Sequence, residues 1–337
     1  MKDLQAIVRH LTAAPRGPSV LATLVTVEGS SYRRPGARLL VTRDRLRIGS
    51  ISGGCLEEDV MARAEIIAAT GSPELVTYDT TSENDLVWGV GLGCQGVVRV
   101  FIERLPSCPD WAPAVVANLS AGRQSKLAVT WRSTDPARLG TRLAAGTAKN
   151  QRGTPYGADG VFNETIPPPT RIFVFGAGDD ARPLVNFAKE IGWSVTVADP
   201  RPAFAAAGRF PSAEKVLCAP AEKLVSQANP GPDAVAVVMT HHYIHDVPLL
   251  RDLVRRPLAF LGLLGPKKRA KKILDDLEAG GLELTAKMRS SLHAPVGLDI
   301  GGETPDEVAL SIVAEIQAVL AGRNGRPLRE RRKPIHD

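Results

Sequence analysis

Cysteine and aromatic residues are scarce in this chain of 337 residues, which has four cysteines and 5% aromatic residues. The cysteines contain no C-x-x-C spacing, which argues against a structural zinc site, and in a cytosolic chain they are expected as reduced thiols and not as disulfides. No apolar run approaches the length that spans a bilayer, so no membrane contact is expected. Hydrophobic residues at 44% and charged residues at 23% are typical of globular domains. With no secretory signal in the first residues, the sequence predicts a soluble, cytoplasmic protein.

The positive charge is unevenly distributed along the chain. The formal net charge is +6, and the segment from Arg323 onward holds six Lys or Arg against two Asp or Glu. No stripe of basic and aromatic residues occurs elsewhere, which argues against nucleic acid as a partner. Residues 323–337 are interpreted as a solvated, unstructured tail, with a binding arm as the less favoured alternative.

Two domains are expected from the length of the chain. Residues 153–170 are rich in glycine and proline and predict a linker. In residues 1–152 strand-like runs outnumber helical ones, which predicts a mixed α/β domain. In residues 171–322 short apolar runs alternate with helical patterns, which predicts a Rossmann-like domain with a doubly wound parallel sheet.

The last long helical pattern of this domain carries marked ends. Thr304 is expected as its N-cap, Pro305 as its first residue and Glu307 as the partner in a capping box. Gly322 is expected to stop the helix.

A glycine-rich turn opens the second domain. Gly176, Gly178 and Ala181 follow an apolar strand in a G-x-G-x-x-A pattern, and Asp199 ends the next strand. This order predicts a site for NAD(P) or another nucleotide, with phosphate on the helix N-terminus and Asp199 on a ribose. The acids at 179 and 180 would repel a pyrophosphate, so a turn that only packs a helix on the sheet is an equal alternative.

Thr240 and His241 follow the next long apolar run. They are expected at the carboxyl end of a strand, where open α/β sheets bind ligands. His242 and His245 are close in sequence, but this spacing in a loop does not bring imidazoles together without structural help. A polar lining of a cleft is therefore favoured over a metal site.

One cysteine of the first half stands in a glycine turn. Gly53, Gly54 and Cys55 precede a helical pattern, which puts the thiol at a helix N-terminus. That position favours the thiolate, the form that attacks electrophiles and binds soft metals, although the acids that follow oppose it. A small buried apolar residue is an equal alternative for Cys55 alone.

A second cysteine, Cys94, follows Gly93 in another glycine-rich turn. So much glycine implies close approach of the backbone to another group. Cys55 and Cys94 are therefore predicted to share a pocket for a soft metal or a sulfur-bearing ligand. Cys108 and Cys218 are assigned no role.

Three arginines surround a proline-glycine turn near the start of the chain. Arg33, Arg34 and Arg38 flank Pro35 and Gly36. Guanidinium groups bind phosphate through two hydrogen bonds, so a phosphate site is one interpretation. A solvated hairpin turn is the other.

Taken together, these segments resemble the XdhC/CoxI family, the accessory proteins of xanthine dehydrogenase and related molybdenum hydroxylases. The resemblance covers almost the whole chain and is carried by SSYRRPGARLLV, GSISGGCLEEDV, VWGVGLGCQGVVRVFIE, VFGAGDDA, VVMTHHYIHDVPLL, LAFLGLLGPKKRA and APVGLDIGGETPDEVALSIVAEI. It implies a dimeric maturation chaperone that binds molybdenum cofactor (molybdopterin) and protects it during sulfuration. The expected partners are a cysteine desulfurase as sulfur donor and an apo xanthine dehydrogenase-type molybdenum hydroxylase as acceptor.

The resemblance also implies roles for particular residues. Cys55 and Cys94 would contact the molybdenum, and Arg33, Arg34 or the turn at Gly176 would bind the pterin phosphate. The chain departs from the family pattern at three positions, which are Asp179 for a frequent His, Pro266 for a frequent Ser and Gln95 for a frequent Gly.

Two alternatives to a chaperone stay open at this point. One is an NAD(P)-dependent oxidoreductase, with His241 or His245 as the acid and Asp199 on the ribose. The other is a structural component of the dehydrogenase. Fold alone does not choose among them.

Overall fold

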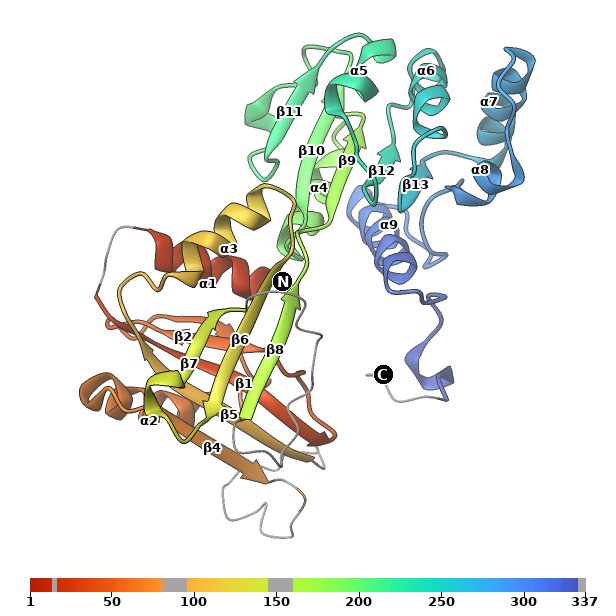
Figure 1. Ribbon diagram of the computed structural model, residues 1–337. Coiled ribbons are helices and arrows are strands. Elements are labelled where there is room, and N and C mark those ends of the chain that lie inside the picture. Colours follow the sequence, from red (N-terminus) through yellow and green to blue (C-terminus); the bar gives the residue numbers. More distant parts are fainter. Residues whose placement is uncertain (14–16, 80, 82–95, 145–159, 333–337) are drawn as a thin grey trace. The chain divides into compact units, whose positions relative to one another are not determined.

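A computed structural model describes residues 1–13, 17–79, 81, 96–144 and 160–332 (Figure 1). The chain divides into two compact units, Met1–Pro168 and Pro169–Asp337. Among the described residues, no helix has the length and apolar character needed to cross a bilayer.

The described part of the first unit holds two antiparallel sheets and three α-helices. One sheet has five strands in the order β3-β2-β1-β5-β4, and the other has three in the order β7-β6-β8. The strands are β1 (Ser19–Gly29), β2 (Arg38–Val41), β3 (Arg47–Ser50), β4 (Glu74–Asp79), β5 (Gly96–Leu105), β6 (Ser125–Arg132), β7 (Gly140–Leu143) and β8 (Gly160–Ile166). The helices are α1 (Lys2–Thr12), α2 (Glu57–Thr70), α3 (Trp111–Ser120) and the short 3₁₀ turn Pro136–Arg138.

Strand β1 is buried on both faces of the five-stranded sheet. Val20, Ala22 and Leu24 share a core with apolar residues of α2, including Val60 and Ile67. The alternate residues of β1 point to the opposite face, since side chains alternate along a strand. Leu21 packs there with α1 and α3, and Val25 packs with residues of the three-stranded sheet. These two faces explain why β1 is an almost continuous apolar run.

The predicted linker is partly wrong. Residues 160–166 of the expected linker form β8, which pairs with β6 in the three-stranded sheet. Phe162 and Ile166 are buried there. The glycines and prolines on both sides obscured this short strand, whose apolar residues are few and partly interrupted by Asn163 and Glu164. The described part of the predicted tail, residues 323–332, is almost entirely exposed and includes the 3₁₀ turn Leu328–Glu330.

The second unit is built on a six-stranded parallel sheet, as predicted. Its strand order is β11-β10-β9-β12-β13-β14. The strands are β9 (Arg171–Phe175), β10 (Ser194–Asp199), β11 (Lys215–Cys218), β12 (Val235–Val238), β13 (Phe260–Leu263) and β14 (Leu292–His293). The helices are α4 (Ala181–Glu190), α5 (Ala221–Ala228), α6 (Tyr243–Leu253), α7 (Lys267–Ala279), α8 (Ala286–Ser291), α9 (Pro305–Leu320) and the 3₁₀ turn Ala207–Arg209.

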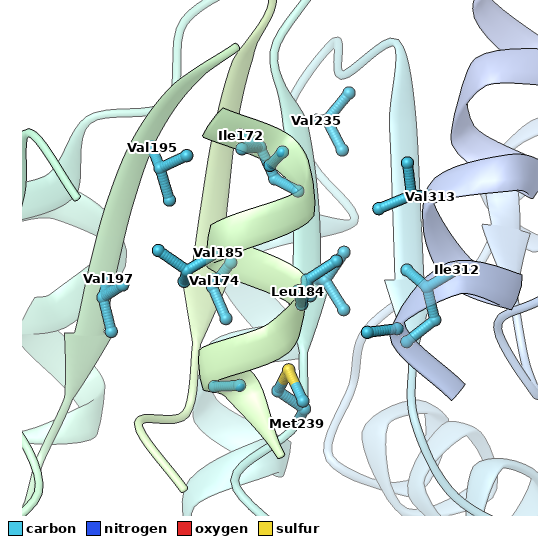
Figure 2. Close-up of a cluster of buried hydrophobic side chains, with 14 of the residues drawn as sticks. Ile172, Val174, Leu184, Val185, Val195, Val197, Val235, Met239, Ile312 and Val313 are labelled. Atoms are coloured by element: carbon cyan, nitrogen blue, oxygen red, sulfur yellow. The ribbon is translucent and has the colours of Figure 1, made fainter. Parts of the chain in front are cut away.

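Helices cover both faces of this sheet. On one face α4 and α9 contribute Leu184 and Ile312 to a core that also holds Ile172 and Val174 of β9. Figure 2 shows these side chains, with α4 lying over the strands and α9 beside it. On the other face α5, α6 and α7 pack on the alternate residues of the same strands, such as Phe175.

The strand order places β9 between β10 and β12, so the chain leaves β9 toward one side of the sheet and later returns on the other. This is the topological switch point of a doubly wound fold, where open α/β sheets bind their ligands at the carboxyl ends of the strands. Gly176 follows β9, and Thr240 lies shortly after β12. The fold therefore brings the glycine turn and the Thr240–His241 segment to the same edge.

Candidate functional site

The Cys55 thiol lies on a short loop between β3 and α2 and is exposed. The loop ends at Leu56, the residue before the helix. Gly54 adopts φ +120°, a conformation that favours glycine, and a side chain there would meet no atom within 4 Å. The sequence prediction of a strand-to-helix turn is therefore confirmed, while the alternative of a buried Cys55 is wrong.

The carboxylate of Glu57 holds this loop in place. It accepts hydrogen bonds from the backbone N–H groups of Ile51 (3.2 Å), Ser52 (2.9 Å) and Gly54 (3.1 Å). The hydroxyl groups of Ser50 and Ser52 also donate to it. Burial of the carboxyl opposes its ionisation, but the bonds from Ser52 and its neighbours outweigh this and lower the pKa of Glu57 to about 2. The backbone of the loop thus surrounds the carboxylate of Glu57.

The proline-glycine turn lies against this loop through Tyr32. Two ring carbons of Tyr32 lie 3.6 Å from the point where a Cβ of Gly53 would stand, and Tyr32 is 68% exposed. Arg33 forms an ion pair with Asp3 of α1 at 2.6 Å. Arg34 is exposed and forms no ion pair with the described residues. Of the two predicted phosphate ligands, only Arg34 is uncommitted in this part of the chain.

Arg38 does not face solvent with its two neighbours in the motif. It is 2% exposed, donates to the Gly36 carbonyl at 2.9 Å and pairs with Glu164 of β8 at 2.7 Å. Its Nε and second terminal nitrogen are buried without a hydrogen-bond partner among the described residues. The interpretation of Arg38 as part of an exposed phosphate site is therefore wrong, because the side chain lies between the two sheets and ties the turn to β8.

The second predicted cysteine, Cys94, and its neighbour Gly93 lie outside the described residues. In the described part of the chain, no group of three or more His, Cys, Asp or Glu side chains is arranged to hold a metal ion. The predicted Cys55–Cys94 pocket stays a prediction.

The glycine turn of the second unit fits closely against β12. Gly176 adopts φ +124°, and a Cβ there would stand 2.5 Å from the Met239 carbonyl. Ala181 opens α4 and is fully buried in the core. At Gly178, a Cβ would lie 2.5 Å from Oδ1 of Asp180. Gly176 is thus required by the backbone of Met239 beside it, whereas the atom closest to Gly178 belongs to the Asp180 side chain.

The two acids of this turn are both paired with basic side chains of the unit. Asp179 accepts a hydrogen bond from Arg209 at 2.7 Å. Asp180 bonds Nε2 of His241 at 2.6 Å. This bond raises the pKa of His241, and partial burial opposes the rise. His241 itself adopts φ +59°, a left-handed conformation that brings its ring over the start of α4.

Asp199, the expected ribose ligand, is fully buried and bonded on both oxygens. It accepts from the N–H of Ala177 (2.7 Å) and from the backbone and guanidinium of Arg201 (2.8 to 2.9 Å). Burial opposes ionisation, but these bonds outweigh it and lower the pKa of Asp199. Its carboxylate joins β10 to the glycine turn.

Thr240 also has internal partners. It is almost fully buried, and its hydroxyl donates to Asp246 of α6 at 2.5 Å. Asp246 is paired in turn with Arg269 of α7. Thr240 therefore positions the segment that carries His241.

The structure thus gathers the predicted residues into two groups. Gly53, Gly54 and Cys55 lie together in the first unit, close to Tyr32. The second unit gathers the other group at one edge of its sheet, and this group consists of Gly176, Gly178, Ala181, Asp199, Thr240 and His241. Sequence reasoning missed Glu57 and Tyr32. An acid five residues after Ser52 and an aromatic residue inside the arginine turn were the available signals.

Comparison with known proteins extends over both units. The family model for the XdhC and CoxI family matches residues 13–79, and the model for the XdhC Rossmann domain matches residues 172–316. A Bacillus subtilis protein named as a probable xanthine dehydrogenase subunit is 36% identical, covering 88% of this chain and 92% of its own. The Escherichia coli molybdenum cofactor insertion chaperone PaoD is 24% identical, over 89% of this chain and 83% of its own.

A solved structure agrees with these matches. The crystal structure of a Bacillus halodurans protein described as a xanthine dehydrogenase aligns with a TM-score of 0.79 and 29% identity, covering 98% of this chain and 99% of the other. The strand order, the two matched models and the relative of 36% identity agree, and this chain belongs to the XdhC and CoxI family.

Proposed function

We propose that this protein is a molybdenum cofactor chaperone that holds the cofactor on the Cys55 loop and delivers it to an apo molybdenum hydroxylase of the xanthine dehydrogenase type. The observation that carries the proposal is the exposed Cys55 thiol on a loop fixed by Glu57. A thiol is a soft ligand suited to molybdenum and to a sulfur-bearing ligand. The naming of PaoD as a molybdenum cofactor insertion chaperone supports this assignment.

The loop suits a holding role because it needs no rearrangement to present the thiol. The N–H groups of Ile51, Ser52, Gly54 and Leu56 donate to Glu57 or Ser52, and Gly54 leaves the turn open because it carries no side chain. A fixed loop loses little conformational entropy when it binds a ligand. Arg34 is the described member of the arginine turn that is exposed and without an ion pair among the described residues, and we assign it to the phosphate of the pterin.

Other parts of the proposal concern partners and assembly. The cofactor would receive its terminal sulfur while bound, from a cysteine desulfurase, and leave when the acceptor enzyme binds. Transfer requires the chaperone to bind the cofactor less tightly than the acceptor does, so a moderate affinity is expected. We also expect the protein to be a homodimer and to lie in the cytoplasm. Light scattering on the purified protein tests whether it is a homodimer.

An NAD(P)-dependent oxidoreductase gains no support from the geometry. Asp180 and His241 are paired at the N-terminus of α4, and Asp199 is bonded on both oxygens by Ala177 and Arg201. A dinucleotide would need these contacts to be replaced. If NADH bound to the folded protein, a concentration of a thousand times its Kd would raise the free energy of unfolding by about 4 kcal/mol. We expect no such shift.

The experiment that tests the function measures molybdenum and pterin in protein purified without oxygen from cells with ample cofactor. Cys55→Ser and Cys94→Ser are compared with wild type, and Cys108→Ser serves as the matched control because Cys108 is exposed in the same unit. We expect near-stoichiometric cofactor in wild type and in the control, and loss in the Cys55 variant. Empty wild-type protein that binds NADH tightly would refute the chaperone assignment.

A further inference from the structure

Four of the six backbone N–H groups of the Cys55 loop, residues 51–56, already donate within the chain. The N–H groups of Ile51, Ser52 and Gly54 donate to Glu57, and those of Gly54 and Leu56 also donate to the Ser52 hydroxyl. The carboxylate of Glu57 already occupies the position that an anion would take in such a loop, and it is ionised at neutral pH because its pKa is about 2. A second anion would be repelled there.

The groups that the loop does expose are the backbone of two glycines and a thiol. Gly53 and Gly54 present bare backbone, and the thiol of Cys55 follows them. Tyr32 completes this surface, since its ring lies beside Gly53 at van der Waals distance while 68% of the residue is exposed. Of the large hydrophobic side chains that are exposed among the described residues, Tyr32 is the one that is aromatic.

The turn that carries Tyr32 is held by two contacts of residues that follow Tyr32. Arg33 is fixed to Asp3 of α1 at 2.6 Å. The carbonyl of Gly36 accepts from the buried Arg38, which is paired with Glu164 of β8. These contacts restrain the backbone that follows Tyr32, which lowers the entropy lost by the turn when a ligand binds against the ring.

We propose that Tyr32 is the stacking surface for the planar pyrimidine ring of the pterin in the cargo, so that this ring lies beside Tyr32 and Gly53 with the Cys55 thiol near the sulfur-bearing end of the molecule. This inference rests on the proposed function. It specifies that the loop reads the flat heteroaromatic part of the molecule and that the phosphate is bound away from the loop, by Arg34. Stacking on an aromatic residue needs only a π-face and suits a planar ring.

The test measures the affinity of the purified full chain for molybdenum cofactor released anaerobically from a molybdoenzyme, by ultrafiltration and pterin analysis. Tyr32→Leu removes the ring and Tyr32→Phe retains it. Ile66→Ala is the matched control, because Ile66 is 63% exposed on α2 in the same unit. We expect Tyr32→Leu to raise Kd by about 5- to 100-fold, the range that loss of one aromatic stacking contact gives. Tyr32→Phe and Ile66→Ala should stay within about twofold of wild type, since neither removes a stacking face.

The outcomes separate this inference from the function on which it rests. Loss of binding in Tyr32→Phe as large as in Tyr32→Leu would show that the hydroxyl acts instead of the ring, and unchanged binding in Tyr32→Leu would overturn the inference while leaving the chaperone assignment intact. Absence of cofactor binding by the wild type would overturn both. Because Tyr32 is exposed, its variants should melt within about 2 °C of wild type. Free pterin gives a second readout, since stacking should quench its fluorescence with wild type and Tyr32→Phe but not with Tyr32→Leu.

Discussion

Replacing Glu57 by Gln should destabilise the first unit in a way that depends on pH. The drop of the Glu57 pKa from 4.5 to about 2 corresponds to roughly 3 kcal/mol of folding free energy. Glu57 is only 6% exposed, so solvent screens these bonds little. Since the pKa is lower in the folded protein, the stabilisation is present in full above about pH 5 and is lost as the pH falls toward 2. Less than half of it remains at about pH 3.

Calorimetry on the full chain measures this effect. A loss of roughly 3 kcal/mol lowers the Tm of a unit of this size by about 6 to 12 °C at pH 7. Glu58→Gln is the control, because Glu58 is the exposed neighbour, and its cost should stay below about 0.5 kcal/mol. Hydrogen exchange over residues 50–56 locates the change, with faster exchange expected in Glu57→Gln. Equal melting of the two variants, or a Glu57 deficit that is the same at pH 7 and pH 3, would refute the reasoning.

Three further predictions concern ion pairs. Glu164→Gln leaves the buried Arg38 without its carboxylate and should cost about 2 to 4 kcal/mol in urea unfolding, whereas Glu28→Gln at the exposed pair with Arg99 should cost less than about 1 kcal/mol; equal costs would contradict this. Asp180→Asn removes the carboxylate charge that helps to raise the pKa of His241, so the imidazole should titrate at lower pH in an NMR titration, and an unchanged midpoint would contradict the assigned pairing. Asp199→Asn weakens the bonds from Arg201 and should destabilise the second unit by about 3 kcal/mol in calorimetry, with a change below about 1 kcal/mol as the contrary result.

Features set by short stretches of chain could be predicted from the sequence. The capping box at Thr304 and Glu307 forms as expected, because its partners are three residues apart. The parallel sheet followed from apolar runs that alternate with helical patterns. The turn that presents Cys55 also followed, since two glycines before a helical pattern leave few alternatives.

Contacts between distant segments could not be predicted in this way. The sequence predicts Arg38 as a third surface arginine. In the structure it is buried against Glu164 of β8, which lies 126 positions away in the chain. The charge of Asp199 suggested a ribose ligand. Its carboxylate instead accepts hydrogen bonds from Arg201, two residues later, and from a backbone N–H of the glycine turn. A sequence shows which groups can bind a ligand, whereas the fold decides which of them already have a partner.

The two units differ in which of their polar groups already have a bonding partner. At the switch point of the second unit, Asp179, Asp180 and Asp199 are each bonded to a basic side chain of that unit, which is Arg209, His241 and Arg201 in turn. A phosphate or ribose would therefore compete with contacts that already stabilise the fold, and its net gain in binding free energy would be reduced by their loss. On the Cys55 loop, Glu57 and Ser52 accept from four backbone N–H groups, while the thiol is exposed. A ligand that needs a group without a partner therefore finds one in the first unit, which is why we propose Cys55 and Tyr32 as its binding residues although the Rossmann turn is the more familiar binding motif.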